Sequence, residues 1–88
     1  MVEAKVVVRN KVGLHARPAA MFVQEAMRYK SKITVEAAGK KADGKSILQV
    51  LALGVKAGQE IIVRADGQDE EEAVRSLVCL AGKDVEGE

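Results

Sequence analysis

The spacing of apolar residues switches repeatedly between two periods, and this constrains the fold more than any other feature of the chain. A period of two over residues 2–8 predicts a strand with one buried face. From Ala16 the period becomes helical, and one face of that helix collects the apolar residues Ala19, Phe22, Val23 and Ala26. The period of two returns over residues 33–37 and 59–65, which predicts two further strands.

Two capping-box motifs predict two further helices. In Ser46-Ile-Leu-Gln49 the serine hydroxyl is expected to accept the third N–H of the helix, while the glutamine side chain reaches back to the serine. This helix is expected to run to about Leu53, and Gly54 ends it with a left-handed residue. The segment Asp69-Glu-Glu-Glu72 is expected to cap a last helix, which ends at Gly82 and buries Ala73, Val74, Leu77 and Ala81.

The predicted elements alternate in a way that indicates the fold class. Their order is strand, helix, strand, strand, helix, strand, helix, where the third strand is a short, charged edge strand over Lys40–Asp43. This order predicts an α+β fold with one four-stranded antiparallel sheet, three helices on one face and water on the other. The sequence contains no linker, repeat or low-complexity segment, so residues 1–88 are expected to form a single domain.

Composition argues against several classes of function. Fourteen basic and 13 acidic residues leave a net charge of +1, which argues against nucleic-acid binding through bulk charge. The two aromatic residues, Phe22 and Tyr29, are too few for base stacking. One histidine and one cysteine cannot supply a usual zinc site, so we expect no metal and no other cofactor. Because the sequence has neither a membrane-spanning run nor a secretory pattern, we expect a cytoplasmic protein.

Charge is distributed unevenly along the chain. Residues 1–65 hold 12 basic and 5 acidic residues, whereas residues 66–88 hold 2 basic and 8 acidic residues. One interpretation is a basic face prepared for an acidic partner. We favour the simpler alternative, in which the acidic residues lie at a helix start and in a solvated tail.

The stretch Gly13–Pro18 carries the side chains with the clearest chemical role. His15 is the only histidine and stands at the predicted start of the first helix, where free N–H groups favour a bound anion. Arg17 adds a guanidinium suited to phosphate. The positive helix end disfavours the imidazolium, which keeps His15 neutral and nucleophilic near pH 7. Because the sequence offers no acid/base partner and no aspartate pair for magnesium, these residues predict a phosphoryl carrier rather than a nucleotide-binding enzyme.

Two longer motifs resemble those of a known family. The segment Gly13-Leu-His-Ala-Arg-Pro-Ala-Ala-Met-Phe-Val23 closely resembles the active-centre motif of HPr, the histidine-containing phosphocarrier family of the bacterial sugar phosphotransferase system. The segment Lys45-Ser-Ile-Leu-Gln-Val-Leu-Ala-Leu-Gly-Val55 is similar to that family's second motif, at the right separation. The likeness covers the whole chain and implies an open-faced β-sandwich, which agrees with the four strands and three helices predicted above.

The resemblance implies a place in a phosphoryl relay. Enzyme I would pass phosphate from phosphoenolpyruvate to Nδ1 of His15, which would donate it to the IIA unit of a sugar permease. Arg17 corresponds to the arginine that helps to hold the phosphoryl group. Ser46 corresponds to the serine that an ATP-dependent HPr kinase/phosphorylase modifies, after which the protein serves as corepressor for a catabolite control protein. Physical chemistry alone explains Ser46 as an N-cap, so its regulatory role follows from the resemblance only.

Three residues depart from the pattern of many relatives. Gln49 stands in place of a glycine, Ala52 in place of a small hydroxyl residue, and Val12 in place of a hydroxyl residue beside the histidine. Because Gln49 would complete the capping box, we expect it to hold the Ser46 hydroxyl and slow its phosphorylation. These departures bear on the regulatory role more than on the carrier role.

The helix after Ser46 has almost no polar side, so some of its apolar residues must be exposed. We expect a docking patch for several protein partners, because Met and aliphatic side chains adapt to different surfaces. The alternative is a loosely buried helix. The expected patch comprises Ala16, Ala20, Gln24, Met27, Ile47, Leu48, Gln49 and Leu51.

The main alternative function is a purely regulatory, HPr-like binding module. His15 argues against it, because relatives of that type lack the histidine, and the Ser46 motif argues against the nitrogen-linked paralogues. We expect a monomer that binds neither nucleic acid nor membrane. On the last helix Cys79 points away from the core stripe, so we expect a solvent-accessible thiol without a chemical role.

Overall fold

The computed structural model describes residues 1–9 and 16–82, and the predicted strands and helices are all present. In chain order they are β1 (Val2–Val7), α1 (Ala16–Ala26), β2 (Lys32–Ala37), β3 (Lys40–Asp43), α2 (Ile47–Ala52), β4 (Glu60–Asp66) and α3 (Glu70–Ala81). Their ends lie close to those expected, because Gly and Pro residues and caps mark most of them in the sequence.

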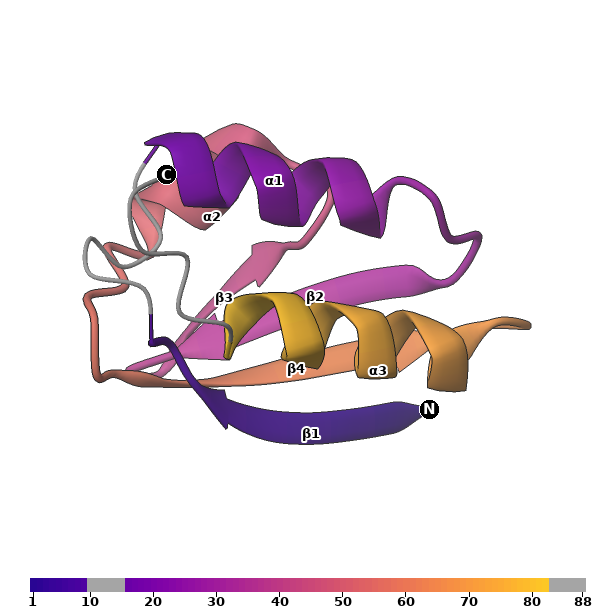
Figure 1. The fold of residues 1–88 in the computed structure, drawn as a ribbon. Helices are drawn as coiled ribbons and strands as arrows, with labels where there is room; N and C mark the ends of the chain where they lie inside the picture. The colour runs from indigo at the N-terminus through magenta and orange to yellow at the C-terminus, as the bar shows by residue number, and fades with distance from the viewer. Residues whose placement is uncertain (10–15, 83–88) are drawn as a thin grey trace.

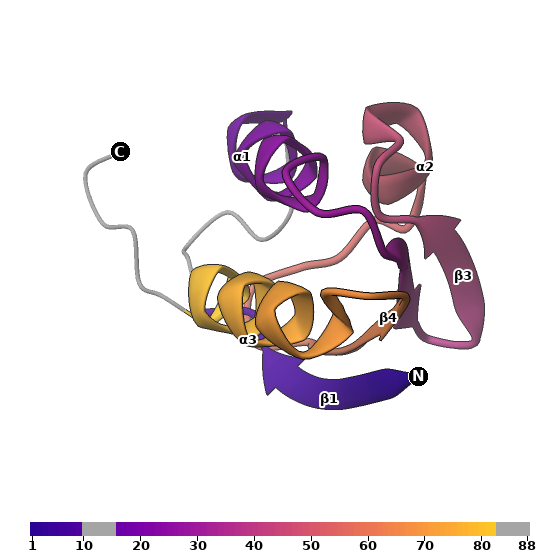
Figure 2. The same cartoon turned by 90° about the vertical axis from the view of Figure 1, so that its right-hand side faces the viewer.

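The four strands form one antiparallel sheet in the order β1-β4-β2-β3. In the middle of the sheet, Val63 of β4 lies between Ala4 of β1 and Val35 of β2. Figures 1 and 2 show the three helices on one side of this sheet, with α3 over β1 and β4 and with α1 beside α2. The fold is therefore the α+β open-faced sandwich that the sequence predicts.

The core lies between the helices and the covered face of the sheet. α1 contributes Phe22, which is 1% exposed, and α3 contributes Leu77, which is fully buried. Ile33 and Ile61 close the core from the sheet side. The apolar stripes predicted for both helices are buried, and Cys79 is exposed on the far side of α3 as predicted.

The edge position of β1 limits the burial of its apolar residues. Val2, Ala4 and Val6 alternate with exposed residues, as the period of two predicted, and they are half-buried rather than fully buried because β1 has a neighbouring strand on one side only. Val8 lies just beyond the strand and is fully buried, and its N–H donates to the carbonyl oxygen of Gln59 over 3.0 Å.

Ala38 and Gly39 form the turn between β2 and β3. Ala38 has φ of 52° and Gly39 has φ of 81°. Two successive residues with positive φ form the type I′ turn that joins antiparallel strands with little strain. A positive φ costs more free energy at Ala38 than it would at a glycine. Gly39 is therefore the residue of this turn that adopts the required backbone without strain.

The capping box expected at the start of α3 is wrong. Asp69 is the N-cap residue but makes no side-chain hydrogen bond to the helix. Its carboxylate instead accepts from the N–H of Lys30 and the N–H of Ser31, both over 2.9 Å, and from the Ser31 hydroxyl over 2.6 Å. These bonds pull the Asp69 carboxylate away from α3, because Ser31 is a buried polar residue that needs a partner. Asp69 therefore fastens the loop after α1 to the start of α3.

Candidate functional site

The start of α1 provides backbone groups suited to an anion. α1 begins at Ala16, so His15 directly precedes the helix in sequence. The N–H groups of Ala16 and Arg17 lie in the first turn, where they have no carbonyl acceptor within the helix. No acidic residue occupies this first turn, so none competes with an incoming anion. His15, Val12 and the side chains of Ala16 and Arg17 lie outside the described residues.

Ser46 is the N-cap of α2, as the sequence predicts. Its backbone is extended, with φ of −114° and ψ of 112°, and its hydroxyl accepts from the N–H of Gln49 over 3.3 Å. The Ser46 carbonyl accepts the first helical bond, from the N–H of Val50, over 3.0 Å. The Ser46 side chain is half-exposed, so the hydroxyl stands at the helix end with access to solvent.

The return arm of the Ser46 capping box is wrong. The Gln49 side chain does not reach Ser46; its Oε1 accepts from the N–H of Asp43 over 2.9 Å. The Ser46 N–H donates instead to the Asp43 carbonyl over 3.0 Å, and the Asp43 carboxylate accepts from the Lys45 N–H over 2.9 Å. Asp43 thus provides the acceptors that Ser46 and Lys45 need, and Gln49 braces the turn from the helix side. The contact between Gln49 and Ser46 involves the Gln49 main chain only.

A second contact ties the turn before α2 to α1. The ammonium group of Lys45 donates to the carbonyl oxygen of Tyr29, just beyond α1, over 2.6 Å. Gly44 donates its N–H to the Ile33 carbonyl over 2.9 Å, and a Cβ at Gly44 would lie 2.5 Å from Cγ2 of Ile33. Gly44 therefore allows the backbone to approach β2 closely. Hydrogen bonds to Gln49, to the Tyr29 carbonyl and to the Ile33 carbonyl fix the turn that precedes Ser46.

The expected docking patch divides into exposed and half-buried residues. Leu48 is 77% exposed and Met27 is 65% exposed, which are unusual values for large apolar side chains. Gln24 and Gln49 are exposed, while Ala20, Ile47 and Leu51 are half-buried. α1 and α2 pack against each other, so the structure brings these residues onto neighbouring helices. Val50 is the residue of α2 that is fully buried, whereas the other apolar residues of this helix are half-buried or exposed.

Sequence reasoning missed a polar contact between α1 and α3. The Glu25 carboxylate accepts from the Ser76 hydroxyl of α3, from the Tyr29 hydroxyl over 3.2 Å and from Arg28 over 3.2 Å. The Ser76 hydroxyl and then Arg28 and Tyr29 hold the pKa of Glu25 below its ordinary value. Arg28 and Tyr29 follow Glu25 by three and four residues at the end of α1, and this spacing is a usable signal, but no pattern in the sequence points to Ser76.

Two further properties concern the described part of the chain. Over residues 1–9 and 16–82, no three His, Cys, Asp or Glu side chains gather closely enough to hold a metal ion. Among the helices of the same residues, none combines the length and apolar character needed to cross a membrane.

The chain is similar to known proteins over nearly its whole length. A family model described as "PTS HPr component phosphorylation site" matches residues 2–82. The HPr-like protein Crh of Bacillus subtilis is 47% identical over 85 residues, which cover 97% of this chain and all of Crh. The phosphocarrier protein HPr of Mycoplasma capricolum is 40% identical over 77 residues, which cover 88% of this chain and 86% of that protein.

A solved structure supports the same relationship. The crystal structure of HPr-C-His from Thermoanaerobacter tengcongensis superposes with a TM-score of 0.89 at 48% sequence identity, and the match covers 92% of this chain and 91% of that chain.

Proposed function

Because the chain belongs to the HPr family of the phosphotransferase system, we propose that His15 accepts a phosphoryl group from Enzyme I and donates it to IIA units of sugar permeases. The observation that carries this proposal is the position of His15 in sequence, directly before the first turn of α1. In this role the protein is a carrier in the cytoplasm rather than an enzyme that turns over alone.

In each transfer step, one covalent bond to the phosphorus atom forms and another breaks. The neutral imidazole attacks through Nδ1, a P–N bond to His15 forms, and the bond between phosphorus and Enzyme I breaks. In the second step a bond between phosphorus and the IIA unit forms, the P–N bond breaks, and His15 is again a free imidazole. The N–H groups of Ala16 and Arg17 and the positive end of α1 favour the dianionic phosphate while it is held. Arg17 supplies the opposite charge through its guanidinium.

Docking of both partners uses the same surface in this proposal. Leu48 of α2 and Met27, directly after α1, are the most exposed large apolar side chains of this region, and flexible aliphatic groups suit a surface that meets several partners in turn. Ala20 and Gln24 of α1 and Ile47 and Leu51 of α2 are further exposed or half-buried residues of these two packed helices. Ala20 and Gln24 belong to the helix whose first residue, Ala16, follows His15 directly in sequence.

A second function concerns Ser46, and the similarity to Crh, an HPr-like protein, favours it. We propose that an HPr kinase/phosphorylase phosphorylates the Ser46 hydroxyl and that a catabolite control protein binds the product. Phosphate at a helix N-cap is favoured by the helix dipole, so the modification can be held without unfolding α2. The carrier function remains the main proposal, because a purely regulatory protein would not need a histidine at position 15.

Reconstituted sugar phosphorylation tests the carrier proposal. Enzyme I, a IIA-containing permease and phosphoenolpyruvate are combined with the native protein, with His15→Ala or with Ser46→Ala. We expect His15→Ala to abolish transfer and Ser46→Ala to preserve it. Sugar phosphorylation supported by His15→Ala would overturn the carrier assignment. The regulatory proposal is tested separately with ATP and the kinase, where Ser46→Ala must lose all incorporated phosphate.

A further inference from the structure

Asp43, the last residue of β3, uses its backbone and its side chain to build the turn that precedes Ser46. Its N–H donates to Oε1 of Gln49 over 2.9 Å, and its carbonyl accepts from the N–H of Ser46 over 3.0 Å. Its carboxylate accepts from the N–H of Lys45 over 2.9 Å. These three bonds hold Asp43 beside Ser46, so its negative charge is a fixed part of the surroundings of the Ser46 hydroxyl.

Chain geometry limits how far the Asp43 carboxylate can be from the serine. Its oxygen lies 2.9 Å from the Lys45 nitrogen, and two residues of chain span at most about 7 Å. The carboxylate is therefore within about 10 Å of the Ser46 hydroxyl, which is close to the Debye length at physiological ionic strength. Asp43 is exposed and Ser46 is half-exposed, so water and salt weaken the interaction between charges at these positions without removing it.

The other charged residue of this turn directs its charge elsewhere. The ammonium of Lys45 donates to the carbonyl of Tyr29, just beyond α1, over 2.6 Å. α1 packs against α2, and at its end Glu25 and Arg28 form an ion pair with each other over 3.2 Å. Within the turn, Lys45 therefore places its charge at the end of α1, whereas Asp43 keeps its charge on the turn itself.

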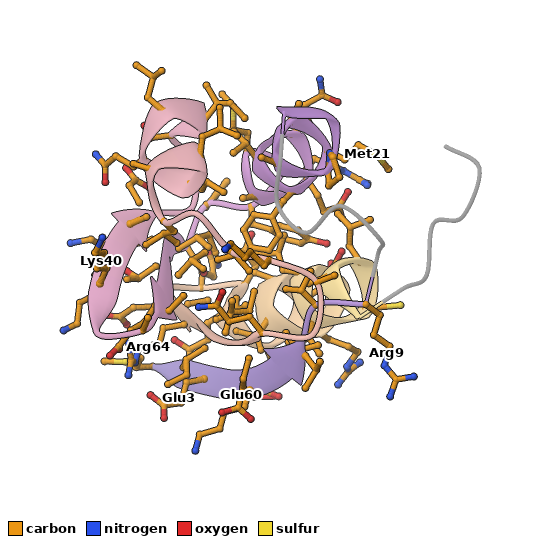
Figure 3. All side chains as sticks on the ribbon, turned by 90° about the vertical axis from the view of Figure 1, so that its left-hand side faces the viewer. Glu3, Arg9, Met21, Lys40, Glu60 and Arg64 are labelled. Carbon is orange, nitrogen blue, oxygen red and sulfur yellow. The ribbon has the colours of Figure 1, made fainter. Side chains whose placement is uncertain are left out.

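The lysines of the neighbouring strands lie beside other acidic residues or at the far end of β3. Lys41 of β3 is opposite Glu36 of β2, and Lys32 of β2 is opposite Asp66 of β4. Lys40 begins β3, at the hairpin end of the strand, and Figure 3 shows it at the edge of the sheet. These lysines are present in both forms of the protein compared below, so replacing the Asp43 carboxylate isolates its own effect.

Phosphorylation adds negative charge next to Asp43. The Ser46 oxygen attacks the γ-phosphorus of ATP, an O–P bond to the serine forms, and the bond between that phosphorus and the oxygen of ADP breaks. ADP leaves, and the hydroxyl proton passes to a basic group of the kinase. The phosphoserine then carries a charge of about −1.5 to −2 at pH 7. Because like charges within about 10 Å repel each other, the Asp43 carboxylate makes the phosphorylated form less favourable.

We propose that Asp43 limits the phosphorylation of Ser46, because its carboxylate lowers the fraction of the protein that carries phosphate at equilibrium. This inference rests on the proposed kinase reaction at Ser46. The turn needs only an acceptor at position 43, so the substitution Asp43→Asn keeps it: the amide oxygen accepts from the Lys45 N–H as the carboxylate does. Protection of the Lys45 N–H from hydrogen exchange verifies the turn in this variant.

The equilibrium of the kinase reaction tests the proposal independently of kinase contacts. The native protein and Asp43→Asn are incubated with HPr kinase/phosphorylase, ATP and ADP until the phosphorylated fraction is constant. A contact to the kinase changes forward and reverse rates together, so the final ratio reports the substrate protein alone. We expect Asp43→Asn to raise the ratio of phosphorylated to free protein about two- to fourfold at low salt, and about 1 M salt to remove most of this difference.

Glu60→Gln is the matched control for loss of one negative charge. Glu60 is exposed on β4 and lies opposite Val7 of β1, two strands away from β3. Its substitution should leave the phosphorylated ratio at the native value. An equal or lower ratio for Asp43→Asn than for the native protein, or a rise in Glu60→Gln as large as in Asp43→Asn, overturns the proposal.

Phosphoserine inserted at position 46 during translation tests the same interaction without the kinase. The phosphorus NMR signal is titrated with pH in the native background and in Asp43→Asn. Because a neighbouring negative charge disfavours the phosphate dianion, its second pKa, ordinarily about 6, should be lower by about 0.3 in Asp43→Asn. Equal pKa values overturn the effect of Asp43 alone. Failure of the kinase to phosphorylate any of these proteins overturns the regulatory function of Ser46 and this proposal with it.

Discussion

Removing the Gln49 side chain tests how the turn before α2 is held. The substitution Gln49→Ala deletes the bond from the Asp43 N–H to Gln49 Oε1, which is 2.9 Å long and exposed. Such a bond contributes about 0.5–1.5 kcal/mol, and alanine recovers a few tenths through its higher helix propensity. We therefore expect a loss of about 0.5–1 kcal/mol, seen as a fall in Tm of about 2–8 °C. Gln49→Gly should be less stable by about a further 1 kcal/mol.

Amide hydrogen exchange separates this account from a closed capping box. In Gln49→Ala the Asp43 N–H should lose protection, while the Ser46 N–H should keep it, because Ser46 donates to the Asp43 carbonyl. The matched control is Gln24→Ala, at an exposed glutamine of α1. Equal stability of Gln49→Ala and the native protein, or lost protection at Ser46 rather than Asp43, would refute the reasoning.

Three further predictions concern pH, transfer and the thiol. The Ser31 hydroxyl and then the Lys30 N–H lower the pKa of Asp69 from 3.8 to about 2, so their stabilisation is present above the ordinary pKa and is lost as pH falls through about 2. Ser31→Ala should thus lower stability in urea unfolding at pH 7 but much less at pH 2, and an equal loss at both would contradict this. Arg17→Ala should slow phosphoryl transfer by about tenfold or more in rapid-quench kinetics, and unchanged kinetics would remove Arg17 from the site. Cys79, exposed on α3, should react quickly with a thiol reagent in the native protein, and reaction only after denaturation would place it in the core.

The apolar pattern predicts this fold well, because buried residues recur every second residue in a strand and every three or four residues in a helix. The buried stripe of α3, namely Ala73, Val74, Leu77 and Ala81, follows from helical spacing alone. The left-handed residue after α2 is Gly54, with φ of 64°, as the sequence indicates. The half-burial of Val2 could not be predicted in the same way, because it depends on β1 being at the sheet edge.

Polar side chains were harder to place, because their partners are distant in sequence. Asp69 and Gln49 both stand at capping positions, yet each binds backbone groups of a neighbouring segment. A capping motif specifies which residues can bond within a helix end, but tertiary contacts compete for the same oxygen atoms. The Ser46 cap is confirmed by its bond from the Gln49 N–H. The short serine side chain reaches only nearby N–H groups, so no distant partner competes for it. The roles of His15, Arg17 and the docking residues stay predictions.

Intact-mass measurement of the protein after incubation with Enzyme I and phosphoenolpyruvate tests the central claim most directly. We expect the native protein to gain one phosphoryl group, acid to remove it, and Ser46→Ala to gain the same group. His15→Ala should show no gain under identical conditions. An unmodified native protein, or an acid-labile phosphoryl group on His15→Ala, would contradict the assignment of His15 as the phosphoryl carrier.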